Sequence, residues 1–308
     1  GPHPAFISCK HKYIRQMPGR IICESVDSRN NKAYRIGLQT REQHIKRDKA
    51  TSNICTSQAL LANVVAMYSV YHGRDGLMDI TNSIINKTNK FYNLLISFGI
   101  DIKTQLPLFD TIVIRDSKCS EIYTKLLEEN IVVRKINAKE IGITFDETTT
   151  VDNMNNIFEI ITSCFKINFD DFKSDMDNDN IRKNVCNIDT QLYRKTDLLN
   201  GEVFKNYHTE TELMRYINYL DKKDFTLCDG MMPLGSCTMK LNSASQLQPL
   251  SWDSVMNIHP YTPRKFTKGY HEMIDMLSEK LKNITGFTHV SYQPNSGAMG
   301  EYSGLLCI

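Results

Sequence analysis

A serine and two glycines close to the end of the chain have the types and the spacing of a phosphate-binding turn. Ser296, Gly297 and Ala298 stand where a helix is predicted to begin, in the string QPNSGAMGEYSGLLCI. The first N–H groups of a helix have no acceptor inside the helix, and the helix dipole makes this end positive, so anions bind there. Gly297 and Gly300 would let a ligand approach the backbone closely, and Ser296 adds a hydroxyl. The alternative is that Ser296 or Asn295 only caps a helix that packs tightly through its glycines.

A second stretch crowds small hydroxyls, a thiol and an ammonium into the short string GSCTMK (235–240). The string has no regular apolar period and is predicted to be a loop, which is where proteins usually present binding groups. Its side chains can line a polar pocket: Ser236, Cys237, Thr238 and Lys240. The alternative is a surface turn with a half-buried thiol.

A third polar stretch, REQHIKRDKATSNICT (41–56), precedes an apolar helix. Its cationic and amide groups could meet a carboxylate or a phosphate: Arg41, His44, Arg47, Lys49 and Asn53. A run of charges is more often a solvated face, so the stretch is ambiguous by itself. His259, which precedes Pro260, is equally ambiguous, because a single histidine is more often structural than catalytic.

Composition excludes several classes of protein. The 308 residues are 41% hydrophobic and 23% charged, which is ordinary for a globular protein of one or two domains. The net charge of +2 comes without a dense basic stripe, so nothing calls for a nucleic-acid partner. The most apolar stretch, 59–71, is too short to span a bilayer, so no membrane association is expected.

The nine cysteines stand far apart, without a CxxC pair. This spacing argues for reduced thiols in a reducing compartment and against a metal site. We expect most of them to be small core residues. Cys55 and Cys237 are the expected exceptions, because they lie in polar loops near Lys49 and Lys240, whose positive charges favour the thiolate.

Apolar periodicity predicts the elements that would position these loops. A strand is expected at 4–9, a hairpin with turns at Pro18-Gly19 and Asn30-Asn31, and a helix at 57–72 that Gly73 ends. Residues 75–165 then read as a compact α-β-α-β-β-α module with helices on one side of a small sheet. Its first helix is predicted to end at Gly99, and its strands to cover 109–114, 131–136 and 141–145. An acidic, polar stretch at 167–180 is predicted to be a solvated linker. Thr209 and Glu212 form a capping box before a helix, and a second helix covers 270–284 and is ended by Gly286.

Five strings of this chain together resemble one family. They are QTREQHIKRDKATSNICTSQALLAN, NYHTETELMRYINYL, MMPLGSCTMKLNS, NIHPYTP and ITGFTHVSYQPNSGAMGEYSGLL. They are similar to glycine dehydrogenase (aminomethyl-transferring), the P-protein of the glycine cleavage system. The resemblance covers nearly the whole chain and is weakest in residues 100–185.

The resemblance implies an α/β fold built from tandem fold-type-I, aspartate-aminotransferase-like halves that run through one polypeptide. Only the second half carries pyridoxal phosphate in this family. The chain would then divide into four parts: 1–72, the end of the large domain of the cofactor-free first half; 73–165, its small α/β domain; 166–200, a linker; and 201–308, the N-terminal arm and the start of the large domain of the second half.

The resemblance also implies a chemistry. Ser296, Gly297 and Ala298 match the family's cradle for the phosphate of pyridoxal 5′-phosphate. The implied reaction is the decarboxylation of glycine, an oxidoreductase step of glycine catabolism in which the aminomethyl group passes to the lipoyl group of the H-protein. Other implied residues line the active site where the halves meet: Thr51, Asn53, Cys55, Ser236, Cys237, Thr238, Lys240 and His259. The full-length enzyme would be a homodimer, in the mitochondrial matrix of a eukaryote or the cytoplasm of a bacterium.

One departure from the family limits this expectation. The lysine that forms the Schiff base lies in a downstream His-Lys string that this chain lacks, and the aromatic or histidine residue that stacks on the cofactor ring is also downstream, so no catalytic residue is assigned. We therefore expect an internal fragment without activity of its own. Two alternatives stay open: another fold-type-I pyridoxal-phosphate enzyme, or a non-enzymatic binding or scaffold module derived from the first half. A parent reading frame that continues into a His-Lys string would favour the enzyme.

Overall fold

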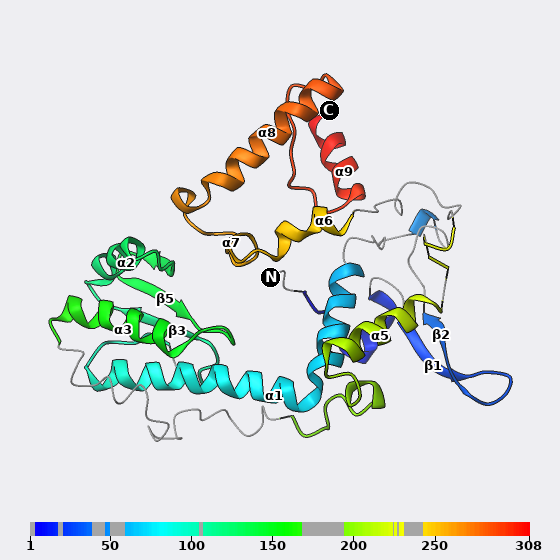
Figure 1. Cartoon of the computed structure of the whole chain (residues 1–308), viewed down its shortest axis with the longest axis horizontal. Coiled ribbons are helices and arrows are strands. Elements are labelled where there is room, and N and C mark those ends of the chain that lie inside the picture. Colours follow the sequence, from blue (N-terminus) through cyan, green and yellow to red (C-terminus); the bar gives the residue numbers. More distant parts are fainter. Residues whose placement is uncertain are drawn as a thin grey trace. The chain divides into compact units, whose positions relative to one another are not determined.

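The computed structural model shows a mixed α/β chain (Figure 1). It describes residues 4–17, 21–38, 47–49, 59–104, 107–167, 194–223, 225–226, 228–230 and 243–308. The chain divides into two compact units, one of residues Ser69–Leu220 and one of Gly1–Tyr68 with Asp221–Ile308. Each unit is described by itself below.

The unit Ser69–Leu220 is built around a three-stranded antiparallel sheet. In the order β3-β5-β4, its strands are β3 (Thr111–Arg115), β5 (Glu140–Thr144) and β4 (Arg134–Asn137). Three helices accompany the sheet: most of α1 (Ala59–Ser97), α2 (Cys119–Glu128) and α3 (Val151–Phe165). The α-β-α-β-β-α order predicted for 75–165 is confirmed, and the strand predicted at 131–136 is observed as β4.

The core of this unit lies on one face of the sheet. Ile112 pairs with Ile143 and Ile114 with Ile141 across β3 and β5, and all four side chains are buried. Because side chains alternate along a strand, the residues on either side of these isoleucines, including Arg115 of β3 and Glu140 of β5, point to the opposite face. The buried face packs against apolar residues of the three helices: Phe91, Leu94 and Leu95 of α1, Ile122 and Leu126 of α2, and Met154, Phe158 and Ile161 of α3.

Local signals set the ends of these helices. Thr150 caps α3: its hydroxyl accepts from Asn153 N (3.1 Å), and the Asn153 side chain accepts from Thr150 N (3.0 Å). The second part of α1 ends at Gly99, which has a positive φ of 72°, and Ile100 N donates back to Leu95 O. Glycine suits this position because other residues rarely adopt the left-handed conformation. The stop predicted at Gly99 is thus confirmed.

The helix α1 consists of two helical segments that meet at a break at Gly73. Residues 59–97 are helical on both sides, but Gly73 has φ 59° and ψ −168°. The predicted end of the first helix at Gly73 is therefore confirmed, and a second helical segment begins directly afterwards.

After the residues 168–193, the same unit contains a short 3₁₀ helix, η6 (Glu202–Phe204), and most of α5 (Glu210–Asp221). The predicted capping box is confirmed, because Thr209 N and its hydroxyl donate to Glu212 Oε2 and Glu212 N donates to the Thr209 hydroxyl. Tyr207 stacks on Tyr216 of α5 with 4.3 Å between ring centroids.

In the other unit, β1 (Ile21–Val26) and β2 (Lys32–Leu38) form the predicted antiparallel hairpin. The Asp27 carboxylate accepts from Arg29 N and Asn31 N at 2.8 Å, and Asn30 takes a positive φ of 62° at the turn. These hydrogen bonds, first from Asn31, hold the pKa of Asp27 below its ordinary value. The second predicted turn, Pro18-Gly19, lies outside the described residues.

The strand predicted at 4–9 is wrong. Residues 4–10 have no regular structure, and a 3₁₀ helix, η1 (His11–Gln16), follows them. An alternating apolar pattern specifies a strand only where a partner strand is present to pair with it, and none of the described residues pairs with this segment.

In the part that the structure describes, the other regular elements of this unit are helices. A 3₁₀ helix, η2 (Arg47–Lys49), precedes α1, and later residues form α6 (Ala244–Leu247), η7 (Gln248–Ser251), α7 (Asp253–Met256), η8 (Arg264–Phe266), α8 (Lys268–Thr285) and α9 (Gly297–Cys307). Helix α8 confirms the prediction for 270–284 and ends at Gly286, whose φ is 76°. None of the helices in the described ranges is long and apolar enough to cross a membrane.

Candidate functional site

The predicted phosphate-binding turn is the N-terminus of α9. Ser296 is the N-cap residue in an extended conformation, and its Oγ accepts from Met299 N at 3.3 Å. Gly300 N donates to Ser296 O at 2.9 Å. The helix start that the sequence predicted at Ser296 is therefore confirmed. Its capping bond is also what the alternative interpretation expected.

The first N–H groups of α9 remain open to a ligand. Within the described ranges, the N–H groups of Gly297 and Ala298 have no hydrogen-bond acceptor. A Cβ built on Gly297 would meet no atom within 4 Å, so the space beside this backbone is empty. These observations suit an anion, because unpaired donors at a helix N-terminus carry positive potential.

A hydrogen bond from α8 holds the segment that leads into this turn. Tyr292, four residues before Ser296, bonds through its hydroxyl to the hydroxyl of Ser278 on α8 at 3.1 Å. Helix α8 is therefore the element that supports the approach to α9. The sequence pattern predicted both helices but not this contact.

His259 lies in a tight turn of the same unit. Thr262 N donates to His259 O at 2.9 Å, and Tyr261 N donates to His259 Nδ1 at 3.0 Å. Because Nδ1 accepts this bond, the proton of the neutral ring is on Nε2. The ring of Tyr261 lies 5.5 Å away, centroid to centroid. In the described residues no hydrogen bond joins His259 to the turn at Ser296, so its assignment to the active site stays a prediction.

The other predicted site residues lie outside the described residues: Thr51, Asn53, Cys55, Ser236, Cys237, Thr238 and Lys240. Their roles therefore stay predictions. The part of the chain that the structure describes contains no group of three metal-ligating side chains. Two open grooves in the unit Ser69–Leu220, of about 430 and 790 Å³, contain none of the predicted site residues.

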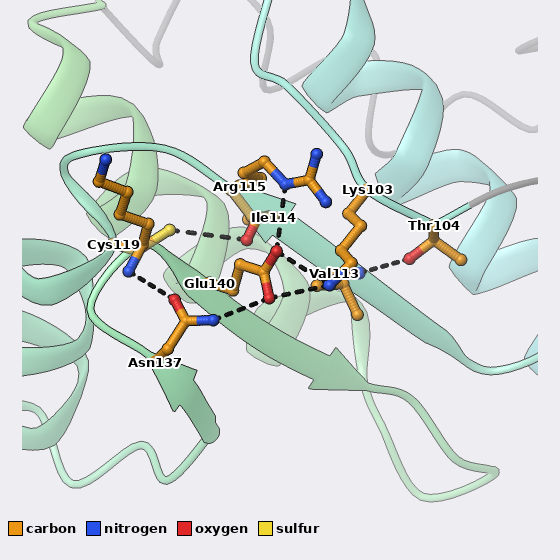
Figure 2. A network of polar contacts seen from close by, with 9 residues as sticks. Lys103, Thr104, Val113, Ile114, Arg115, Cys119, Asn137 and Glu140 are labelled. Atoms are coloured by element: carbon orange, nitrogen blue, oxygen red, sulfur yellow. Dashed lines mark hydrogen bonds and ion pairs between the residues drawn. The ribbon is translucent and has the colours of Figure 1, made fainter.

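The structure reveals a polar cluster that the sequence analysis missed. Figure 2 shows Glu140 of β5 between Lys103, Arg115 and Asn137, on the face of the sheet opposite the core. Its carboxylate accepts from Lys103 Nζ (2.9 Å), Arg115 Nε (3.1 Å) and Asn137 Nδ2 (2.9 Å). The Glu140 side chain is only 10% exposed, whereas those of Lys103 and Arg115 are about half exposed.

These contacts make Glu140 structural rather than catalytic. The hydrogen bond from Lys103 is the largest influence that holds its pKa below the ordinary value; burial opposes it, and the bonds from Arg115 and Asn137 reinforce it. A carboxylate stabilised in its charged form and occupied by three donors is a poor proton acceptor. Arg115 and Glu140 are paired in the β3–β5 register, and register is the signal that could have predicted this cluster.

The cysteines differ in part from the expectation that most are core residues. Of the described free thiols, Cys119 and Cys164 are buried, and burial raises the pKa of both. Cys23 is half-buried, but Cys9, Cys228 and Cys307 are exposed. Small size and low polarity do not by themselves place a cysteine inside a core; its neighbours in the fold decide that.

Comparison with known proteins identifies the family. Residues 1–161, more than half of the chain, match the family described as "Glycine cleavage system P-protein". The chain is 44% identical over 308 residues to "Glycine dehydrogenase (decarboxylating), mitochondrial" of Solanum tuberosum. It is also 44% identical over 309 residues to "Glycine dehydrogenase (decarboxylating) 1, mitochondrial" of Arabidopsis thaliana. All of the chain aligns in both cases, but it spans only 29% of the length of these relatives.

A solved structure, described as "Crystal structure of glycine decarboxylase (P-protein) of the glycine cleavage system, in inhibitor-bound form", is 27% identical to this chain. The similarity covers 50% of this chain and 37% of that chain, with a TM-score of 0.42, which is too low to assign a fold. The family assignment comes instead from the match over residues 1–161 and agrees with the resemblance found in the sequence. The chain belongs to the glycine cleavage system P-protein family.

Proposed function

We propose that this chain is part of a longer P-protein that decarboxylates glycine and transfers the remaining aminomethyl group to the lipoyl group of an H-protein. The observation that carries the proposal is the match of residues 1–161 to the P-protein family. The 44% identity that extends over the whole chain, to relatives named as decarboxylating glycine dehydrogenases, supports the same activity.

The proposed cofactor is pyridoxal 5′-phosphate, with its phosphate at the N-terminus of α9. The unpaired N–H groups of Gly297 and Ala298, and the empty space beside Gly297, fit a phosphate. Ser296 would hold the turn in shape through its bond to Met299 N and orient its hydroxyl toward the anion. When bound, pyridoxal phosphate supplies an electron-withdrawing ring that takes up the electrons left by departing carbon dioxide.

The proposed domain organisation follows the family resemblance. Residues 1–72 and 73–165 would be the end of the large domain and the small domain of a cofactor-free first half, and 201–308 the beginning of the catalytic half. The stretch 166–200 would link them, and the full-length enzyme would be a homodimer.

The loops with Thr51, Asn53 and Cys55, and with Ser236, Cys237, Thr238 and Lys240, would line the active site together with His259. Since both relatives above are named mitochondrial, we propose the mitochondrial matrix as the location in a eukaryotic source.

The test compares the full-length protein that carries this sequence with residues 1–308 alone. Each is incubated with pyridoxal phosphate, carboxyl-labelled glycine and lipoylated H-protein, and released carbon dioxide and the visible absorbance of bound cofactor are measured. We expect turnover and dialysis-resistant cofactor only in the full-length protein. A full-length protein that binds the cofactor but releases no carbon dioxide would contradict the proposed reaction. Turnover by residues 1–308 would show that a lysine within this chain suffices.

A further inference from the structure

The break in α1 leaves a helix end that needs a hydrogen-bond donor. At Gly73 the backbone departs from helical geometry, with φ 59° and ψ −168°. The carbonyl oxygens of the turn before a break lose the donors that a continuous helix would provide. Such a helix end is completed by a side chain, by water or by another segment of the protein.

A histidine from a distant part of the chain completes this helix end. His208 lies 137 residues after Tyr71, and its Nδ1 is 2.7 Å from Tyr71 O. A carbonyl oxygen only accepts hydrogen bonds, so Nδ1 must carry the proton. This bond forms with the neutral ring protonated on Nδ1 and also with the doubly protonated ring. It therefore fixes one tautomer of the neutral imidazole.

The segment that carries His208 lies directly against Gly73. A Cβ on Gly73 would be 2.6 Å from Phe204 O and 2.9 Å from Cε1 of His208, closer than such atoms approach in proteins. Position 73 therefore requires glycine for two reasons: the backbone has a positive φ, and residues 204–208 approach too closely for a side chain. All these residues belong to the compact unit Ser69–Leu220.

The same segment is ordered on both sides of His208. Before it, η6 is reinforced by Lys205 Nζ, which is 3.0 Å from Glu202 Oε1, and by Asn206 Nδ2, which donates to Glu202 O at 2.9 Å. After it, the capping box of Thr209 and Glu212 begins α5. His208 is therefore held between two locally stabilised turns, which limits the entropy lost when its ring meets Tyr71.

We propose that His208 is a positioning residue that fastens the arm 201–209 to the break in α1. The joint consists of the Nδ1 bond to Tyr71 O and the contact of Phe204 and His208 with Gly73. In the domain organisation proposed above, on which this reading depends, the arm begins the catalytic half and Gly73 marks a domain boundary in the first half. The joint then anchors the start of one half on the other, independently of the linker.

The first measurement is the tautomer of His208 in the 308-residue chain labelled with ¹⁵N-histidine. Long-range ¹H–¹⁵N correlation distinguishes a neutral ring protonated at Nδ1 from one protonated at Nε2. We expect the Nδ1 tautomer for His208. A ring protonated only at Nε2 cannot donate to Tyr71 O and would overturn the proposal without any substitution.

The second measurement is hydrogen–deuterium exchange of residues 201–209 and 69–77 in substituted chains. His208→Asn keeps an N–H donor at a position close to Nδ1 and should retain slow exchange. His208→Gln moves the donor outward, and His208→Ala removes it, so both should exchange about five- to thirtyfold faster. Gly73→Ala should have the same effect by steric conflict with Phe204 O.

His289→Ala is the matched control, because His289 is exposed and, among the residues that the structure describes, its Nδ1 bonds to the neighbouring Thr288 (3.0 Å) and not to a distant segment. Wild-type exchange rates in both His208→Ala and His208→Gln would overturn the proposal, as would equal acceleration in His208→Asn. All these readouts are made without glycine or cofactor. Evidence against the joint would therefore not contradict the proposed reaction, and an inactive full-length enzyme would not contradict the joint.

Discussion

The Phe91 ring of α1 meets the Phe158 ring of α3 edge to face, with 5.6 Å between the ring centroids and 85° between the planes. The ring of Phe145, which follows β5, has its centroid 5.0 Å from the centroid of the Phe91 ring. All three rings are buried. Aromatic pairs in such geometries contribute about 0.5–1.5 kcal/mol beyond the burial of their surface. Phe91 therefore connects α1, α3 and the end of the sheet in one core.

Replacing Phe91 by alanine should strongly destabilise the unit Ser69–Leu220. We expect a loss of about 3–5 kcal/mol in the free energy of unfolding, because the substitution leaves a cavity that the fixed sheet and helices cannot fill. Native-state hydrogen exchange of the β5 amides measures this unit separately from the other one. Ile96→Ala, at an exposed site of the same helix, is the control and should cost about 1 kcal/mol or less. Equal losses in the two variants would contradict the assigned core.

Replacing Glu140 by glutamine should change how stability depends on pH. The pKa of Glu140 is lowered in the folded protein, chiefly by Lys103, so its stabilising contribution is complete above the unfolded-state pKa of about 4.3. The contribution disappears as the pH falls through the lower folded-state pKa. We therefore expect wild type to exceed Glu140→Gln in stability at pH near 7, with a difference that shrinks as the medium becomes strongly acidic.

Urea titrations at several pH values, followed by NMR signals of Ile141 and Ile143, would measure this difference. Glu121→Gln is a suitable control, since Glu121 forms an exposed pair with Lys125 at 3.2 Å. That variant should stay within about 0.5 kcal/mol of wild type at neutral pH. If wild type and Glu140→Gln differed by the same free energy of unfolding at every pH, the charged Glu140 carboxylate would not have the stabilising role given to it.

The thiol of Cys119 should resist chemical modification in the folded chain. Cys119 is buried, its Sγ donates to Ile114 O at 3.6 Å, and burial raises its pKa, so little reactive thiolate is present at neutral pH. In a mass-spectrometric labelling time course, we expect Cys119 to react at least about a hundredfold more slowly than exposed Cys9 and Cys228. If Cys119 were labelled as fast as Cys9 and Cys228 in native buffer, and no faster in urea, it would not be buried in the folded chain.

The same experiment on the full-length protein tests the expected roles of Cys55 and Cys237. If their loops line the cofactor site, pyridoxal phosphate should slow the labelling of these two thiols and leave that of Cys9 unchanged. Labelling of Cys55 and Cys237 that is insensitive to the cofactor would remove both loops from the proposed site.

Replacing Gly297 by valine in the full-length protein should weaken cofactor binding without harming the fold. A Cβ at Gly297 meets nothing within 4 Å, so the folded chain has room for it, whereas a ligand that approaches the turn would meet the new side chain. Loss of one charge-assisted hydrogen bond predicts an affinity for pyridoxal phosphate about tenfold to a hundredfold weaker. Gly304→Val is the control, because this glycine is in the same helix and has equally empty surroundings. Equal cofactor dissociation constants for the two variants would place the phosphate elsewhere.

Much of the secondary structure could be predicted because its signals are local. The string FDTIVI (109–114) predicted β3, and the helical spacing of Leu94, Leu95 and their neighbours predicted the second part of α1. Gly99 and Gly286 correctly marked helix ends, since few other residues adopt a positive φ. At the candidate site, the same kind of signal predicted that a helix begins at Ser296. The cofactor assigned to that helix start came from the family resemblance and remains to be tested.

By itself, the sequence determined the order of helices and strands in 75–165, the starts of α5 and α9 and the family, because each depends on residues that are neighbours along the chain or on whole strings of them. Only the tertiary structure decided which polar groups meet. Glu140 bonds to Arg115 and Lys103, 25 and 37 residues earlier, and His208 bonds to Tyr71, 137 residues earlier. Composition did not distinguish these residues from other charged and polar side chains. Their partners follow from strand register and from the break at Gly73, which form only when the packed fold brings distant segments within hydrogen-bond distance.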